Sequence, residues 1–127
     1  MCIRDSIKAA HQAYYQAHKL APKEPLIMVD LAKVQLALND PKLTKSAMGY
    51  LDRALAVERE NVMAWRLLAT AHGKQGNQPM ASLALAERAL LHGDIDEATL
   101  QSTRAASGLK KATPAYRQLL DLSLIHI

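Results

Sequence analysis

The chain has 127 residues, of which 50% are hydrophobic, and lysine and arginine exceed the acids to give a formal net charge of +4. This length is enough for one domain with a buried core. No apolar run approaches the roughly 20 residues that span a bilayer, so we expect no transmembrane segment. The positive charges are spread along the chain, without a basic stretch interleaved with aromatics, so we expect a solvated surface and no nucleic-acid binding.

The two ends of the chain do not look like natural protein. Residues 1–6 and 122–127 back-translate to DNA strings that are reverse complements of each other. These strings resemble the mosaic end of a transposase-based sequencing adapter, so we interpret both segments as translated adapter and exclude them from fold reasoning. The only cysteine, Cys2, lies there, so the natural part offers no disulfide or thiolate. We expect the natural polypeptide to continue in both directions, which would leave an export signal out of view.

Residues 7–121 show helical periodicity throughout. Segment 7–22 is typical of the second helix of a repeat whose first helix is missing. Pro25 suits the first turn of a helix and begins a repeat over 25–58. We expect the turn of this repeat to cover 39–43, about three residues longer than a standard repeat allows. Its second helix should run from Thr44 to Val57.

The clearest pattern lies in the next repeat, 62–92. Trp65, Leu68 and Ala69 recur at helical spacing, and Gly76 stands where that helix should stop. An aromatic, a large apolar residue, a small residue and then a glycine turn are typical of a tetratricopeptide (TPR) repeat. Beyond Pro79 two phases stay open, since the segment fits a second helix and equally a first helix that ends at Gly93.

An atypical repeat over 94–121 follows. Acidic residues in its first turn suit a helix start, and Thr113 as N-cap with Pro114 at the first helical position begins the last helix. We therefore predict an all-α fold, a TPR-like α-solenoid of about seven antiparallel helices in a right-handed superhelix. The residues expected to pack the repeats are Tyr14, Ala17, Met28, Leu31, Ala32, Ala47, Leu51, Ala54, Trp65, Leu68, Ala69, Ala81, Leu85, Ala98, Ala105 and Tyr116.

A more specific resemblance covers nearly all of 7–121. The runs 25–41, 64–69 and 80–94, closed by Thr113-Pro114-Ala115-Tyr116, resemble the C-terminal TPR region of BepA-like bacterial zinc metallopeptidases. The resemblance implies an upstream protease domain with a His-Glu-x-x-His helix, export to the periplasm and a role in outer-membrane protein quality control. It also implies that the solenoid presents partners or substrates to the protease.

The catalytic equipment of that family is missing from this chain. No histidine is followed by glutamate in His-Glu-x-x-His spacing, so we expect no catalytic residue, no metal ligand and no cofactor here, and zinc only in an upstream domain. We interpret His11 and His18 as surface or rim residues, since two turns separate them. His72 is expected to be packed and hydrogen-bonded, and Trp65 to belong to the core.

The exposed face of each first helix is the candidate binding surface. A peptide of acidic character would find apolar contacts and positive charge on a concave face of this kind. The asparagines that other TPR domains use to clamp a C-terminal carboxylate are missing, so that mode is not predicted. The candidate residues are Val29, Lys33, Leu36, Arg66, Thr70 and Lys74.

These observations favour a non-catalytic protein-interaction module, the C-terminal part of a periplasmic zinc metalloprotease, with a protein or peptide as partner. The alternative is a stand-alone TPR scaffold or adaptor without a protease domain. A basic protein that binds RNA or a membrane surface is retained as a third class only because of the positive charge.

The missing first helix generates a testable expectation. Without its partner, the helix in 7–22 should leave apolar surface exposed at Tyr14, Tyr15 or Leu20. We expect the purified chain to self-associate through this truncated end or to unfold at low temperature. Light scattering and thermal unfolding followed by circular dichroism measure both properties. A highly stable monomer with a sharp unfolding transition would contradict the missing half-repeat.

Overall fold

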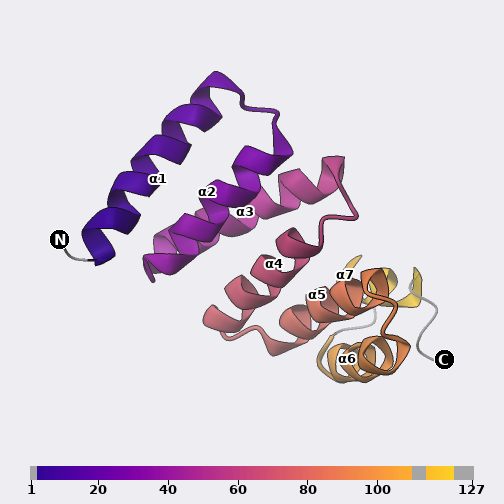
Figure 1. Cartoon of the computed structure of the whole chain (residues 1–127). Helices are drawn as coiled ribbons and strands as arrows, with labels where there is room; N and C mark the ends of the chain where they lie inside the picture. The colour runs from indigo at the N-terminus through magenta and orange to yellow at the C-terminus, as the bar shows by residue number, and fades with distance from the viewer. Residues whose placement is uncertain (1–2, 110–113, 122–127) are drawn as a thin grey trace. The chain divides into compact units, whose positions relative to one another are not determined.

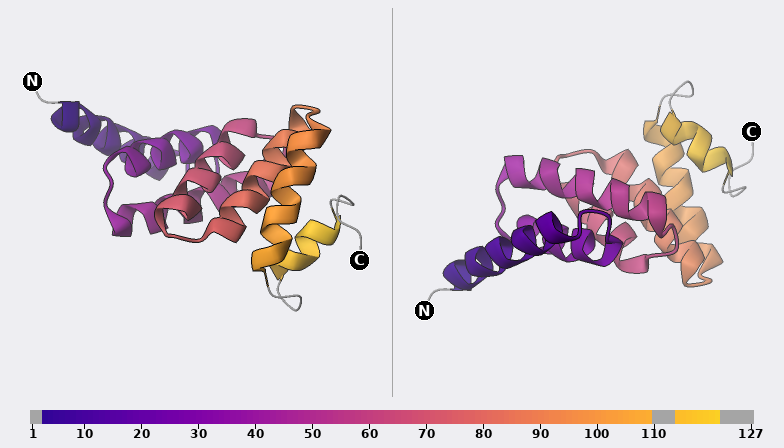
Figure 2. Two further views of the ribbon diagram at one scale, coloured as in Figure 1. Left: turned by 90° about the horizontal axis from the view of Figure 1, so that it is seen from below. Right: turned by 90° about the horizontal axis from the view of Figure 1, so that it is seen from above.

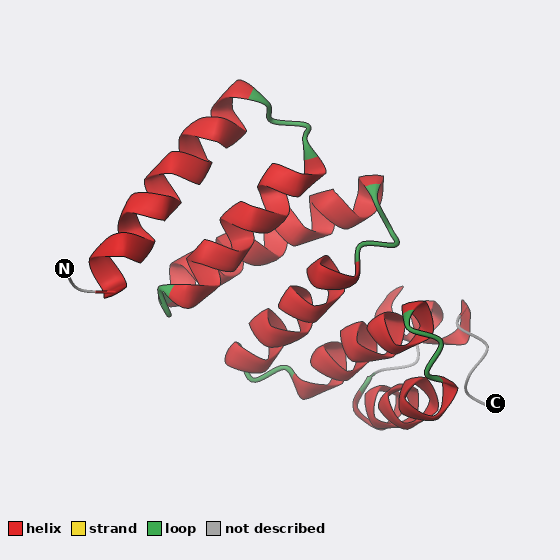
Figure 3. Ribbon diagram, viewed as in Figure 1, coloured by secondary structure: helices red, strands yellow, loops and turns green. Residues whose placement is uncertain are grey.

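The computed structural model describes residues 3–109 and 114–121. Within these ranges the chain is helical and contains no strand, which confirms the all-α prediction (Figures 1 and 3). No helix there combines the length and apolarity that crossing a bilayer requires. The helices are α1 (Ile3–Leu20), α2 (Pro25–Ala37), α3 (Pro41–Val57), α4 (Val62–Lys74), α5 (Gln78–Leu91), α6 (Ile95–Gly108) and α7 (Pro114–Asp121).

The chain divides into two compact units. The first unit is Met1–Leu67 and the second unit is Leu68–Ile127, so the division falls inside α4. In the first unit, α2 packs against both α1 and α3, and successive helices run in opposite directions (Figure 1). Leu31 and Ala32 of α2 and Ala47, Leu51 and Ala54 of α3 are fully buried. Alanine at these positions lets the helix backbones approach closely.

Three of the interhelical turns share one design. In each turn, the residue directly before the N-cap of the next helix has a positive φ. This angle is 54° at Asn39, 75° at Gly76 and 76° at Gly93. This left-handed conformation suits glycine, and asparagine is among the few other residues that tolerate it. The next residue is an aspartate or asparagine, and its side chain accepts a backbone N–H in the first turn of the following helix.

The two glycine turns also satisfy the preceding helix ends. Asn77 N–H donates to the His72 carbonyl at 2.9 Å and Gly76 N–H donates to the Gly73 carbonyl at 3.1 Å. The turn at Gly93 makes the same pair of hydrogen bonds, to the Ala89 and Leu90 carbonyls. This is the Schellman arrangement. Each turn thus ends one helix by pairing two of its last carbonyls and starts the next by pairing one N–H of its first turn.

The turn at Asn39 is shorter than the sequence suggested. We expected residues 39–43 to form the turn and the helix to begin at Thr44, but α3 begins at Pro41. Asp40 caps the helix by accepting from Lys42 N–H at 2.9 Å, and Pro41 occupies the first helical position, where it lacks no useful hydrogen bond. The extra residues therefore lengthen the helix and not the turn.

In the second unit, α5 and α6 pack against each other (Figure 2). Leu83 of α5 and Ala105 of α6 form a buried cluster, and Met80, Ala106, Leu109 and Ala115 pack against it. Helix α7 joins α5 through a hydrogen bond of 2.9 Å, in which Gln118 Nε2 donates to Glu87 Oε1. This face of the α5–α6 pair is therefore covered by α7.

Most of the predicted packing residues are buried, and Tyr14, Ala17 and Leu85 are half-buried. Helix α1 includes residues 3–6, which we assigned to adapter, so that segment continues the helical pattern. Residues 1–2 and 122–127, Thr113 and the side chain of Tyr116 lie outside the described residues.

The end of α6 makes a close backbone contact that is open to test. A Cβ added at Gly108 would overlap Pro79 Cγ and lie 3.0 Å from Pro79 Cβ. We expect Gly108→Ala to destabilise the second unit by about 1–3 kcal/mol, because the proline ring and the helix end must separate. Urea unfolding followed by circular dichroism measures the loss.

Gly49 in α3 provides the matched control. It is exposed, and a Cβ added there meets nothing within 4 Å. Gly49→Ala should therefore stabilise the chain by about 0.5–1 kcal/mol through the higher helix propensity of alanine. Equal effects of the two substitutions would contradict the close approach of Gly108 to Pro79.

Candidate functional site

The predicted concave residues do not share one environment. Val29 and Leu36 are each 3% exposed, so they belong to the core of the first unit and the prediction that they line an accessible face is corrected. Helical periodicity placed them on a common face with Lys33 but did not reveal that these two apolar side chains are covered. Lys33 and Arg66 are exposed in the first unit, and Thr70 and Lys74 are exposed in the second unit.

A cluster of His18, Tyr50 and Arg53 that we did not predict lies in the first unit. His18 is 9% exposed, and its ring meets the Tyr50 ring edge-on, with 4.9 Å between centroids. The Arg53 guanidinium lies over the same Tyr50 ring at 5.0 Å. The interpretation of His18 as a surface or rim residue is therefore wrong, because the end of α1 packs this side chain against α3.

The environment of His18 favours its neutral form. Burial, and secondarily the positive charge of Arg53, lower the pKa of His18 below its ordinary value. Its Nδ1 atom is buried without a hydrogen-bond partner among the described residues. A neutral ring costs less to bury than a charged one, which is consistent with the aromatic contact to Tyr50.

The other histidine of α1 is only half-buried. The Gln35 side-chain amide donates to His11 Nε2 at 3.2 Å, which links α1 to α2. Tyr15 lies one turn further along α1, and its ring centroid is 6.3 Å from that of His11. The Lys19 Nζ atom lies over the Tyr15 ring, 4.8 Å from its centroid. These contacts give the exposed side of α1 a stacked polar and aromatic surface. In the described part of the chain no group of three metal-ligating side chains comes together.

His72 in the second unit is packed as expected, but its Nδ1 atom lacks a hydrogen bond among the described residues. It is buried, and its Nδ1 has no partner among the described residues. Burial lowers the pKa of His72, so the neutral form is favoured here too. The expectation of a hydrogen-bonded histidine is corrected for this atom.

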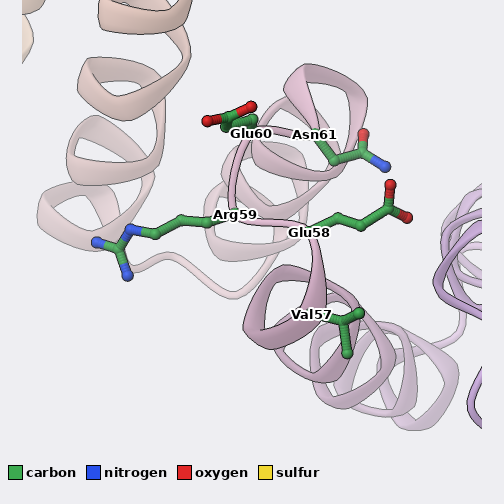
Figure 4. A pocket seen from close by; sticks show the side chains of 5 residues that line it. All are labelled: Val57, Glu58, Arg59, Glu60 and Asn61. Carbon is green, nitrogen blue, oxygen red and sulfur yellow. The ribbon is translucent and has the colours of Figure 1, made fainter.

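Trp65 is buried, and its indole N–H has a structural partner. Trp65 Nε1 donates to the Arg59 carbonyl at 2.9 Å, and Asn61 Oδ1 accepts from Ala64 N–H at 3.0 Å to cap α4. The loop held in this way, Val57–Asn61, lines a pocket of about 520 Å³. In Figure 4 the side chains of Glu58 and Asn61 extend to the same side, while Arg59 extends away from them.

The second unit contains a groove between α5 and α6, with a volume of about 420 Å³. Two polar side chains in its wall are deeply buried, Ser82 at 9% exposed and Gln101 at 6%. Arg104 is exposed at the same groove. The sequence did not predict this groove, because the candidate binding face was assigned to the first helices of the repeats. The residues that line it are Gln78, Pro79, Ala81, Ser82, Leu85, Gln101, Arg104 and Ser107.

Three comparisons with known proteins give no relative. No protein-family model, no curated protein and no solved structure matches the chain. The candidate sites rest on the structure alone. They are the groove of the second unit and the exposed polar surfaces of α1, α2 and α4.

The buried histidines predict a stability that depends on pH. Because the pKa of His18 and of His72 is lowered in the folded chain, the unfolded chain takes up these protons more readily. Their contribution to folding is fully present above about pH 6.5, the ordinary pKa of histidine, and is lost as the pH falls below it. We expect the free energy of unfolding to decrease between about pH 7.5 and 5.5.

His18→Phe should reduce this pH dependence, because phenylalanine retains the aromatic contact with Tyr50 and does not titrate. His92→Gln is the control: His92 is exposed, and its substitution should leave the curve as in the wild type. Urea unfolding across the pH range measures the slope. A slope that is the same in the wild type and in His18→Phe would contradict a neutral, buried His18.

Proposed function

We propose that the chain is a non-catalytic protein-interaction module built as a TPR-like α-solenoid of about seven antiparallel helices in a right-handed superhelix. The observation that carries the proposal is the recurring turn, in which a residue of positive φ is followed by an asparagine or aspartate cap. Helices joined in this way and packed through alanines form hairpins that can stack on one another. Stacked hairpins present large polar faces, which suits binding of another polypeptide.

The turns also bear on the phase of the repeats. Both Gly76 and Gly93 are followed by a capping residue, so α5 is bounded by the same turn on each side. In addition, α5 packs against α6. We propose from this packing that α5 is the first helix of a hairpin with α6, which is one of the two phases that the sequence left open.

The resemblance to BepA-like metallopeptidases extends the proposal to the parent protein. We infer a periplasmic zinc metalloprotease that acts in outer-membrane protein quality control, with this chain as its C-terminal, partner-binding part. Zinc would belong to the upstream domain. A stand-alone scaffold or adaptor with no protease domain remains the alternative proposal.

Two experiments test the proposal. Capture on the immobilised chain from a bacterial envelope extract should retain polypeptides after nuclease treatment. If the chain instead binds only nucleic acid or anionic vesicles, with strong weakening by salt, the interaction module is the wrong class.

The genomic DNA around the coding region decides between the two parent proteins. We expect an export signal and a His-Glu-x-x-His motif upstream of the segment that encodes Ile7. Further TPR-like repeats with neither feature would instead support the stand-alone scaffold.

A further inference from the structure

We propose that the groove between α5 and α6 binds an acidic peptide segment, whose carboxylate pairs with Arg104 while a neighbouring apolar side chain contacts the floor of the groove. This inference rests on the proposed interaction function and names the chemistry of the partner and the site that takes it. The site differs from the first-helix face that the sequence suggested, because it lies between two helices of one hairpin.

The helical spacing of the lining residues creates the groove. On α5, Gln78, Ala81, Ser82 and Leu85 follow one another by three, one and three positions and so share a face. On α6, Arg104 and Ser107 are three positions apart. The opposite face of the hairpin is the one that contains Leu83 and Ala105 and packs against Ala115. The groove is thus on the side of the hairpin away from that cluster.

The charge of the groove favours an anion. Arg104 is exposed, and no residue in the described ranges pairs with its guanidinium. None of the described lining residues is an aspartate or glutamate. An arginine presents a planar fork of N–H donors that matches a carboxylate. A bound carboxylate would therefore gain a charge-assisted hydrogen bond without displacing an internal partner.

Buried polar groups add directional recognition. Gln101 is held in place because its Nε2 donates to Glu97 Oε1 at 2.8 Å. Ser82 is more than nine-tenths buried and lines the groove. The Ser107 hydroxyl donates to the Arg104 carbonyl at 2.9 Å, which ties it to the same turn of helix. A peptide in the groove would meet fixed polar groups as well as the arginine.

The remaining lining residues select a peptide over a nucleic acid. Pro79, Ala81 and Leu85 supply an apolar floor for an aliphatic side chain. The described lining contains no aromatic ring on which a base could stack and no second cation for a phosphate chain. A volume of about 420 Å³ lies within the range of small-ligand pockets and would accept a few side chains of an extended peptide.

Fluorescence polarisation with the whole chain tests the inference. The probe is the labelled peptide acetyl-Leu-Glu-Ala-Glu-Leu-amide, and its neutral counterpart carries glutamine in place of glutamate. We expect the acidic probe to bind about tenfold more tightly, with that preference lost in Arg104→Gln and only partly kept in Arg104→Lys, which retains the charge but not the planar fork. Arg117→Gln is the matched control, since Arg117 is exposed on α7 and does not line the groove.

Several outcomes would overturn the inference. The two probes could bind equally, Arg104→Gln could bind the acidic probe as the wild type does, or neither probe could bind a chain that circular dichroism shows to be helical. Capture of envelope proteins that is unaffected by Arg104→Gln would place the partner elsewhere and leave the interaction function standing. Absence of any protein capture by the wild type would instead count against that function itself.

Discussion

The structure depends on how its helices reverse direction without losing backbone hydrogen bonds. Each helix end exposes N–H or C=O groups that helical geometry cannot pair. At Gly76 and Gly93 the chain adopts the left-handed conformation. The N–H of this glycine and the N–H of the next residue donate to carbonyls of the preceding helix, and the side chain of that next residue caps the following helix. Because these hydrogen bonds form within a few residues, the chain reverses direction over a short turn.

The need to pair backbone groups at each reversal explains which helix ends could be predicted from the sequence. A glycine followed by asparagine or aspartate is a local signal, so the ends of α4 and α5 were predicted correctly. The start of α3 was not, because residues beyond the expected repeat length were assigned to the turn. Asp40 and Pro41 together form an equally local helix start, and that signal was outweighed by the repeat pattern.

The candidate site was less accessible to sequence reasoning. Periodicity identifies the residues that share a face of a helix but not the helix that covers it, which is why Val29 and Leu36 were placed on a surface. His18 was misplaced for a related reason, since its partner Tyr50 lies on another helix, far along the chain. The groove at Arg104 depends on how α5 and α6 lie against each other, which no single helical pattern contains.

The local character of the turns has a consequence for how the chain acquires its structure. Contacts between α2 and α3, and between α5 and α6, join residues that are near in sequence, so each hairpin closes a short loop at small entropic cost. Chains dominated by such contacts reach their native state quickly. We therefore expect the pairs α2–α3 and α5–α6 to form early in folding.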